Sequence, residues 1–158
     1  MPVLDASIAP LFREPAHMVH DDGVAIWFIE PLGMAIQVRA TPPHCTGAAA
    51  TWVSGPAYAR LLRIRGARAA KLHFLHDYSR IRTYDTHARV ALTDWGLRIR
   101  KDVLKIVMAA PDDAPLSRMA ISVAAAALTV AGVPTQVVSG LSVTIKAGGY
   151  RVMLDPTP

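Results

Sequence analysis

Short hydrophobic runs separated by turn-forming residues set the pattern of the chain. The runs over residues 24–29 and 34–38 are joined by four residues that include Pro31 and Gly33. Two apolar runs with a short connection of this kind predict a β-hairpin. Further short segments, each next to polar or proline-containing residues, predict buried strands over residues 72–75, 103–110 and 136–139.

Segments with helical spacing alternate with these strands. Residues 56–69 predict a helix, with Pro56 in its first turn and Gly66 weakening or ending it. A long amphipathic helix is predicted from Asp85, and an alanine-rich helix over residues 116–131. The alternation predicts an α/β fold with a mixed, mainly parallel β-sheet, an N-terminal β-hairpin and helices packed on the sheet.

The chain of 158 residues is long enough for one domain with a buried core. Residues 1–23 contain three prolines and no sustained periodicity, which predicts an extended N-terminal arm. The sequence therefore predicts an arm over residues 1–23, an α/β domain over 24–145 and a C-terminal tail over 146–158.

Charge is unevenly distributed along the chain. The net charge is +5, but residues 39–101 hold twelve Lys or Arg against three Asp. Such a segment predicts a solvated face or a surface that attracts an acidic partner. Only Tyr58 lies near the basic residues of the first predicted helix, whereas single-stranded nucleic-acid sites interleave aromatic residues, so no nucleic-acid partner is expected.

Three further features bear on where the protein acts. No charged residue occurs between Arg118 and Lys146, but only about 15 apolar positions are continuous there, fewer than a spanning helix needs. No transmembrane segment is therefore predicted. The acidic start lacks the layout of a secretory signal, and Cys45 is the single cysteine, so we expect a cytoplasmic protein without disulfides.

The segment over residues 74–92 carries the most specific pattern. An apolar strand ends in Asp77 and Ser79, a short loop follows, and Asp85 and Thr86 open the long helix. Asp or Thr at a helix start accepts hydrogen bonds from free backbone amides. The same position favours a phosphate, because the amides and the helix dipole attract negative charge.

This pattern resembles the signature of the STAS domain, the family of anti-sigma-factor antagonists and sulfate-transporter tails. Asp77, Ser79 and Asp85 match its acidic and hydroxyl positions, and Thr86 matches the hydroxyl that the family phosphorylates. The order of strands and helices also matches, and the likeness is to divergent stand-alone bacterial members. The departure is that His87, Ala88 and Arg89 follow, where the family usually has a small residue and glycine.

The resemblance implies a non-enzymatic regulatory module for protein–protein interaction, possible phosphorylation sites being Thr86 and Ser79. Its partner would be a protein with an acidic surface or a kinase, and a homo-oligomer is left open. The predicted interaction surface comprises Asp77, Arg82, Tyr84, Asp85, His87 and Arg89.

Other functions remain as alternatives. The principal one is an α/β domain that binds a small ligand, a nucleotide or a lipid, at the carboxyl ends of the strands. An enzyme using His76, Asp77 and His87 as acid and base is a weaker one. The sequence has no glycine-rich phosphate loop and no convincing set of metal ligands, so no cofactor and no metal are predicted.

Overall fold

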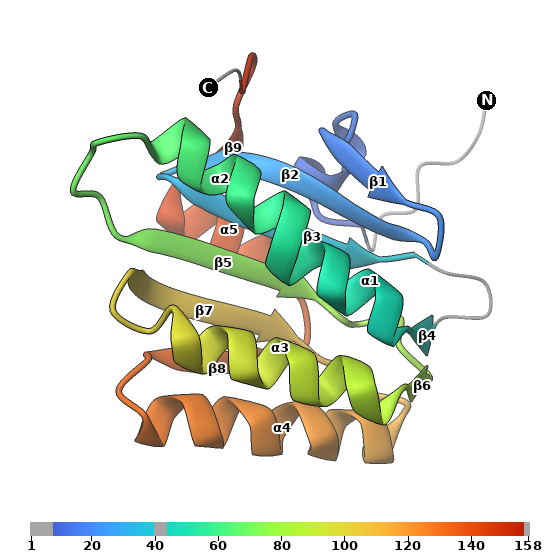
Figure 1. The fold of residues 1–158 in the computed structure, drawn as a ribbon. Helices are drawn as coiled ribbons and strands as arrows, with labels where there is room; N and C mark the ends of the chain where they lie inside the picture. The colour runs from blue at the N-terminus through green and yellow to red at the C-terminus, as the bar shows by residue number, and fades with distance from the viewer. Residues whose placement is uncertain (1–7, 40–43, 157–158) are drawn as a thin grey trace, which may run out of the picture.

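A seven-stranded sheet organises the chain, as the computed structural model shows for residues 8–39 and 44–156 (Figure 1). Its order is β1-β2-β3-β5-β7-β8, and β9 pairs with β2 beyond the end of β1. The strands are β1 (Met18–His20), β2 (Val24–Glu30), β3 (Gly33–Val38), β5 (Leu72–Asp77), β7 (Val103–Ala109), β8 (Thr135–Val138) and β9 (Arg151–Val152). A separate pair of short parallel strands consists of β4 (His44–Cys45) and β6 (Thr83–Tyr84).

The sheet is mixed, as the sequence predicts. β2 and β3 form the antiparallel hairpin, in which Ile26 lies opposite Ile36. From β3 onward, β5, β7 and β8 are added in parallel, each after a helical crossover. Parallel strands are buried on both faces, which explains why they occur in the sequence as continuous apolar runs.

Helices cover one face of the sheet along its length (Figure 1). This layer contains α1 (Gly47–Trp52), the π-helical segment η2 (Val53–Ala57), α2 (Tyr58–Arg65), α3 (Thr86–Arg98) and α4 (Pro115–Val130). The other face carries α5 (Ser142–Gly148) and the short 3-10 helix η1 (Pro10–Arg13). Side chains of β2 alternate between the two layers: Ile26 and Phe28 pack under α1–α4, and Trp27 packs against η1.

The first helical segment begins earlier than its sequence pattern predicts. It starts at Gly47 rather than near Pro56, because the Thr46 side chain accepts a hydrogen bond from the Ala49 amide and caps it. Pro56 lies inside the π-helical segment η2. A proline has no amide hydrogen and crowds the carbonyl one turn earlier, and the wider π turn accommodates it. Gly66 ends the segment at φ +57°, as predicted.

Chain segments on both sides of the predicted domain add strands to the same edge of the sheet. The predicted arm, where it lies within the described residues, contains β1, and Met18 pairs with Ile26 of β2. The predicted tail contains β9, whose Arg151 pairs with Glu30 of β2 in the backbone and by an ion pair of 2.9 Å. These strands have two or three residues, too few to show a period, and β2 supplies their hydrogen-bonding edge.

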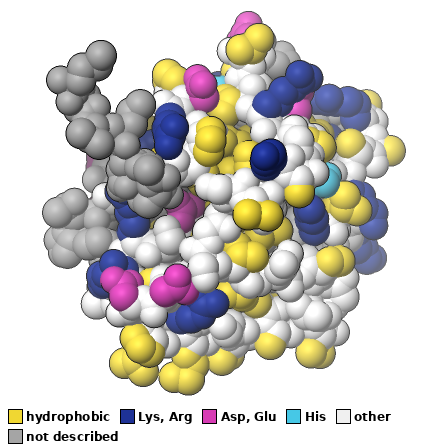
Figure 2. Space-filling model, turned by 180° about the vertical axis from the view of Figure 1, so that it is seen from behind, with side chains coloured by type: hydrophobic (Ala, Val, Ile, Leu, Met, Phe, Trp, Pro, Cys, Tyr) yellow, Lys and Arg dark blue, Asp and Glu magenta, His cyan; other side chains and the backbone are white. Residues whose placement is uncertain are grey.

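Basic side chains do not gather into one patch on the face opposite α1–α4. Among the described residues visible there, Lys and Arg lie at several separate places between apolar and acidic side chains (Figure 2). None of the helices in residues 8–39 and 44–156 combines the length and apolar character that a membrane span requires.

A polar side chain, His76, lies in the core beneath α3. It is 4% exposed, its ring stacks parallel to that of Trp95 with centroids 6.5 Å apart, and its Nδ1 is 2.8 Å from the Tyr78 hydroxyl. Burial lowers the pKa of His76 to about 4. The imidazole is therefore neutral in the folded protein at neutral pH.

The backbones of β3 and β5 lie so close together at Gly33 that a substitution there should lower the stability of the protein. A Cβ at Gly33 would collide with the backbone carbonyl of His73. Gly33→Ala is therefore expected to lower the free energy of unfolding by more than about 2 kcal/mol, measured by urea denaturation. Gly55→Ala is the control, since a Cβ there meets nothing within 4 Å. Equal stability of the two variants would contradict the packing described for the β3–β5 pair.

The buried His76 predicts a loss of stability on mild acidification. Below the ordinary pKa of 6.5 the unfolded chain takes up a proton that folded His76 accepts only near pH 4, so stability falls as the pH decreases between these values. We expect the free energy of unfolding to fall by about 2 kcal/mol between about pH 7.5 and about pH 5. His17 and His73, whose pKa values burial also lowers, act in the same direction.

Urea unfolding at the two pH values measures this change. His76→Gln should reduce the pH dependence of the free energy of unfolding. An equal pH dependence in the wild type and in His76→Gln would show that His76 is not the group responsible.

Candidate functional site

The end of β5 is held by the carboxylate of Asp77. Its Oδ1 accepts hydrogen bonds from the Ser79 amide at 3.1 Å and the Ser79 hydroxyl at 2.5 Å. Its Oδ2 accepts a bond of 2.8 Å from the side-chain amide of Gln37 on β3. Asp77 therefore fixes the loop to the neighbouring strand, and the Ser79 hydroxyl is engaged in the same turn.

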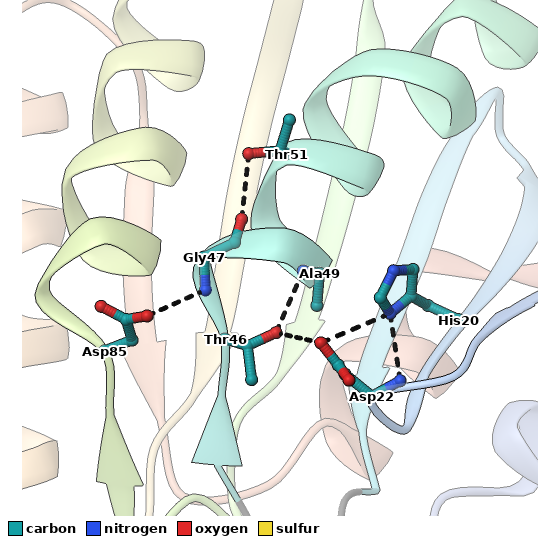
Figure 3. Close-up of polar contacts among 7 residues, drawn as sticks. All are labelled: His20, Asp22, Thr46, Gly47, Ala49, Thr51 and Asp85. Atoms are coloured by element: carbon teal, nitrogen blue, oxygen red, sulfur yellow. Dashed lines mark hydrogen bonds and ion pairs between the residues drawn. The ribbon is translucent and has the colours of Figure 1, made fainter.

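The start of α3 is held by a second carboxylate, that of Asp85. Its Oδ1 accepts a hydrogen bond of 2.8 Å from the His87 amide, which makes Asp85 the N-cap. Its Oδ2 accepts one of 3.2 Å from the amide of Gly47, the first residue of α1 (Figure 3). One carboxylate thus joins the first turns of two helices that are far apart in the sequence.

A second chain of contacts ties the start of α1 to β1. The Thr46 hydroxyl donates to Asp22 Oδ2 at 2.6 Å while it accepts from Ala49 (Figure 3). The amide of Asp22 in turn donates to His20 Nδ1 at 3.1 Å. The sequence does not indicate that these three side chains form part of a site, although Thr46 before an alanine-rich run is a recognisable N-cap signal.

Thr86 is the first residue of α3, and it is exposed. Asp85 supplies the cap, so the helix does not depend on the Thr86 hydroxyl, which makes no hydrogen bond to the described residues. The structure thus places this hydroxyl on the surface at a helix N-terminus. At such a position the local backbone dipole favours a negative group.

The remaining residues of the predicted interaction surface differ in their exposure and in their contacts. His87 and Arg89 are exposed on the first turn of α3. Arg82 is also exposed, and its guanidinium forms an ion pair of 3.0 Å with Asp113. The backbone of Tyr84 belongs to β6, and its side chain lies outside the described part of the structure.

A shallow open groove runs between the starts of α1 and α3. Thr46, Gly47, Asp85, His87 and Val90 are among the residues that line it. A Cβ on Gly47 would lie 3.1 Å from the Cβ of His87, so the absence of a side chain at Gly47 allows the two helices to approach each other. Asp85, Thr86 and His87 thus lie at the edge where the two helices meet.

The structure does not bring the suggested catalytic residues together. His76 lines an internal cavity, His87 lines the outer groove, and Asp77 is bonded to Gln37 and Ser79. His76 and His87 thus face different spaces, and Asp77 lines neither of them. Burial and the charge of Asp85 raise the pKa of Cys45 to about 11, so its thiol stays protonated at neutral pH.

Histidines do not form a metal centre among the residues that the structure describes, which hold no cluster of three or more His, Cys, Asp or Glu suited to an ion. His73 and His76 project to opposite sides of β5, as their odd separation predicts. His73 contacts the Tyr150 hydroxyl, whereas His76 contacts Tyr78.

Comparison with known proteins gives a likeness at the level of the fold. No family model matches the chain, and no curated protein matches it. Among solved structures it is similar to an uncharacterized protein of the DUF3478 family with a SpoIIAA-like fold, from Shewanella loihica PV-4. The two chains are 15% identical with a TM-score of 0.55, over 79% of this chain and 93% of the other. The chain therefore has the SpoIIAA-like, or STAS-like, α/β fold that the pattern around Asp77 and Thr86 predicts.

Proposed function

We propose that this protein is a non-enzymatic regulatory module of the bacterial cytoplasm that binds a partner protein through the surface around the start of α3. Phosphorylation of Thr86 would switch that binding. The observation that carries the proposal is the exposed Thr86 hydroxyl at the first position of α3, beside a carboxylate that already caps the helix.

The capping arrangement makes Thr86 a better switch than Ser79. The Ser79 hydroxyl donates to Asp77, so its modification would break the turn at the end of β5. The Thr86 hydroxyl can be modified without loss of the cap that Asp85 supplies. We therefore assign the switch to Thr86.

A phosphate on Thr86 would change the charge of the surface at a defined place. It adds a charge of about −1.5 to −2 at neutral pH, next to Asp85 in the chain. The helix N-terminus and the cationic side chains of Arg82 and Arg89 favour this charge, while the Asp85 carboxylate opposes it. An acidic partner attracted by the two arginines would be repelled after modification, so the unphosphorylated form is the binding form.

A comparison of partner recovery by charge variants tests the switch. Thr86→Glu should reduce recovery of the partner at least about fivefold relative to Thr86→Ala, because it places a negative charge where the partner docks. Ser142→Glu is the matched control, since Ser142 is an exposed first residue of α5 on the opposite face of the sheet. Recovery is measured by quantitative mass spectrometry of proteins captured by the tagged full chain.

Different results would contradict the proposed switch and the proposed interaction surface. Equal recovery by Thr86→Glu and Thr86→Ala would remove the switch while leaving docking intact. Replacing both Arg82 and Arg89 by Ala tests docking itself, and a partner retained unchanged by that variant would contradict the proposed surface.

A further inference from the structure

The outermost helix of the layer, α4, carries an apolar face that no described segment of the chain covers. Leu116, Met119, Val123 and Val130 are 73%, 57%, 56% and 90% exposed. Their spacing of three, four and seven residues places them on one side of the helix, and the buried residues of α4 lie on the other side. Because α4 forms the lower edge of the molecule in Figure 1, this face is directed away from α3 and the sheet.

This edge of the molecule is also poor in charge. The sequence has no Asp, Glu, Lys or Arg from Met119 to Ile145, a stretch that holds most of α4 and the whole of β8. Among the described strands, β8 pairs with β7 alone, so it is an edge strand. The single charged residue of α4, Arg118, forms an ion pair of 3.1 Å with Asp112. Solvated helix faces and edge strands usually carry charges, so their absence here indicates a surface that another molecule covers.

The apolar face of α4 is large enough for an interface between two chains. Its four large side chains offer roughly 500 Å² per chain, so two copies would bring together about 1,000 Å², the lower range of specific interfaces. Interfaces between identical chains are more apolar than other interfaces and have few charges at their centre. A face without charges also gives a different protein no electrostatic feature to recognise. These properties favour a second copy of this chain as the partner.

The order of large and small residues along α4 makes the face complementary to itself. When two α4 helices run antiparallel with Val123 of one chain opposite Val123 of the other, Leu116 lies opposite Val130. In the same register Met119 lies opposite the exposed Ala127, so a long side chain meets a short one. The N-terminal end of each helix then lies beside the C-terminal end of the other, which is the favourable arrangement of the helix dipoles.

We propose that the protein forms a two-fold symmetric homodimer through the apolar face of α4, with the two helices antiparallel and the Val123 side chains at the symmetry axis. Such an interface uses the same face of both chains and closes after two of them. The loop before α3 contacts the first turn of α4, where the Ser117 hydroxyl donates to the Arg82 carbonyl at 3.2 Å. The dimer would therefore hold its two Thr86 surfaces near opposite ends of the helix pair, which is about 24 Å long. The proposal does not rest on the switch at Thr86.

Analytical ultracentrifugation of the untagged full chain tests the dimer directly. We expect a mass of twice the chain mass of 17.0 kDa, with dissociation on dilution. Val123→Glu should raise the dissociation constant of the dimer at least about tenfold, because two carboxylates would face each other at the axis. Val143→Glu is the matched control and should leave the constant unchanged, since Val143 is 80% exposed on α5, on the opposite face of the sheet.

A charge swap tests the position of the symmetry axis. An equimolar mixture of Val123→Glu and Val123→Lys chains should dimerise more tightly than either variant alone, since opposite charges then face each other. Val123 is exposed in the single chain, so both variants should fold as the wild type does. Circular dichroism and urea unfolding of each variant check this.

Disulfide trapping tests the orientation of the two helices. On oxidation of a mixture, Leu116→Cys chains should form disulfides with Val130→Cys chains, because these positions face each other in the antiparallel pair. Neither variant alone should form a disulfide-linked dimer to a comparable extent. Cys45 does not compete, since it is buried and its pKa is raised to about 11.

Several results would overturn the proposal, and the first needs no variant. A wild-type chain that stays single at a concentration of about 100 µM would mean that a different protein or a lipid surface covers the face. A dimer that Val123→Glu leaves unchanged would place the interface elsewhere on the molecule. Disulfides that join Leu116→Cys chains to each other, and not to Val130→Cys chains, would exclude the antiparallel pair.

Discussion

The carboxylate of Asp85 is the contact on which the arrangement of the candidate site depends. It accepts one hydrogen bond from the first turn of α3 and another from the first residue of α1. The two helices arise from different crossovers of the parallel sheet, and without a common acceptor their first amides would need separate partners. Because Asp85 performs the capping, the following residue, Thr86, is left with its hydroxyl on the surface.

The helix α3 connects the surface around Thr86 with the core. Its first turn presents Thr86, His87 and Arg89 to solvent, and its later turns bury Trp95 and Gly96 in the core. Modification of Thr86 would therefore act on a helix that Trp95 anchors in the core.

The sheet could be predicted from the sequence because its central strands are buried on both faces. Residues 24–29, 34–38 and 72–75 are apolar runs for that reason, and each lies in β2, β3 or β5. The cap at Asp85 was also predictable, since an acidic residue before an amphipathic segment is a local signal. Apolar runs and helix caps can be predicted because each depends on residues that are neighbours in the sequence.

The edge strands and the hydrogen bonds of the candidate site could not be predicted, because they depend on contacts between segments distant in the chain. β1 and β9 are too short to show periodicity and form only because β2 offers an edge. The Asp22–Thr46 bond and the Asp85–Gly47 bond join residues 24 and 38 positions apart.

The most direct measurement compares the free energies of unfolding of Asp85→Ala and Thr86→Ala by urea denaturation. If Asp85 is the cap that leaves Thr86 free, Asp85→Ala should lower the stability by about 1–2 kcal/mol, and Thr86→Ala by no more than a few tenths. A loss in Thr86→Ala equal to that in Asp85→Ala would show that the hydroxyl is itself part of the cap, and would contradict the account of the exposed switch.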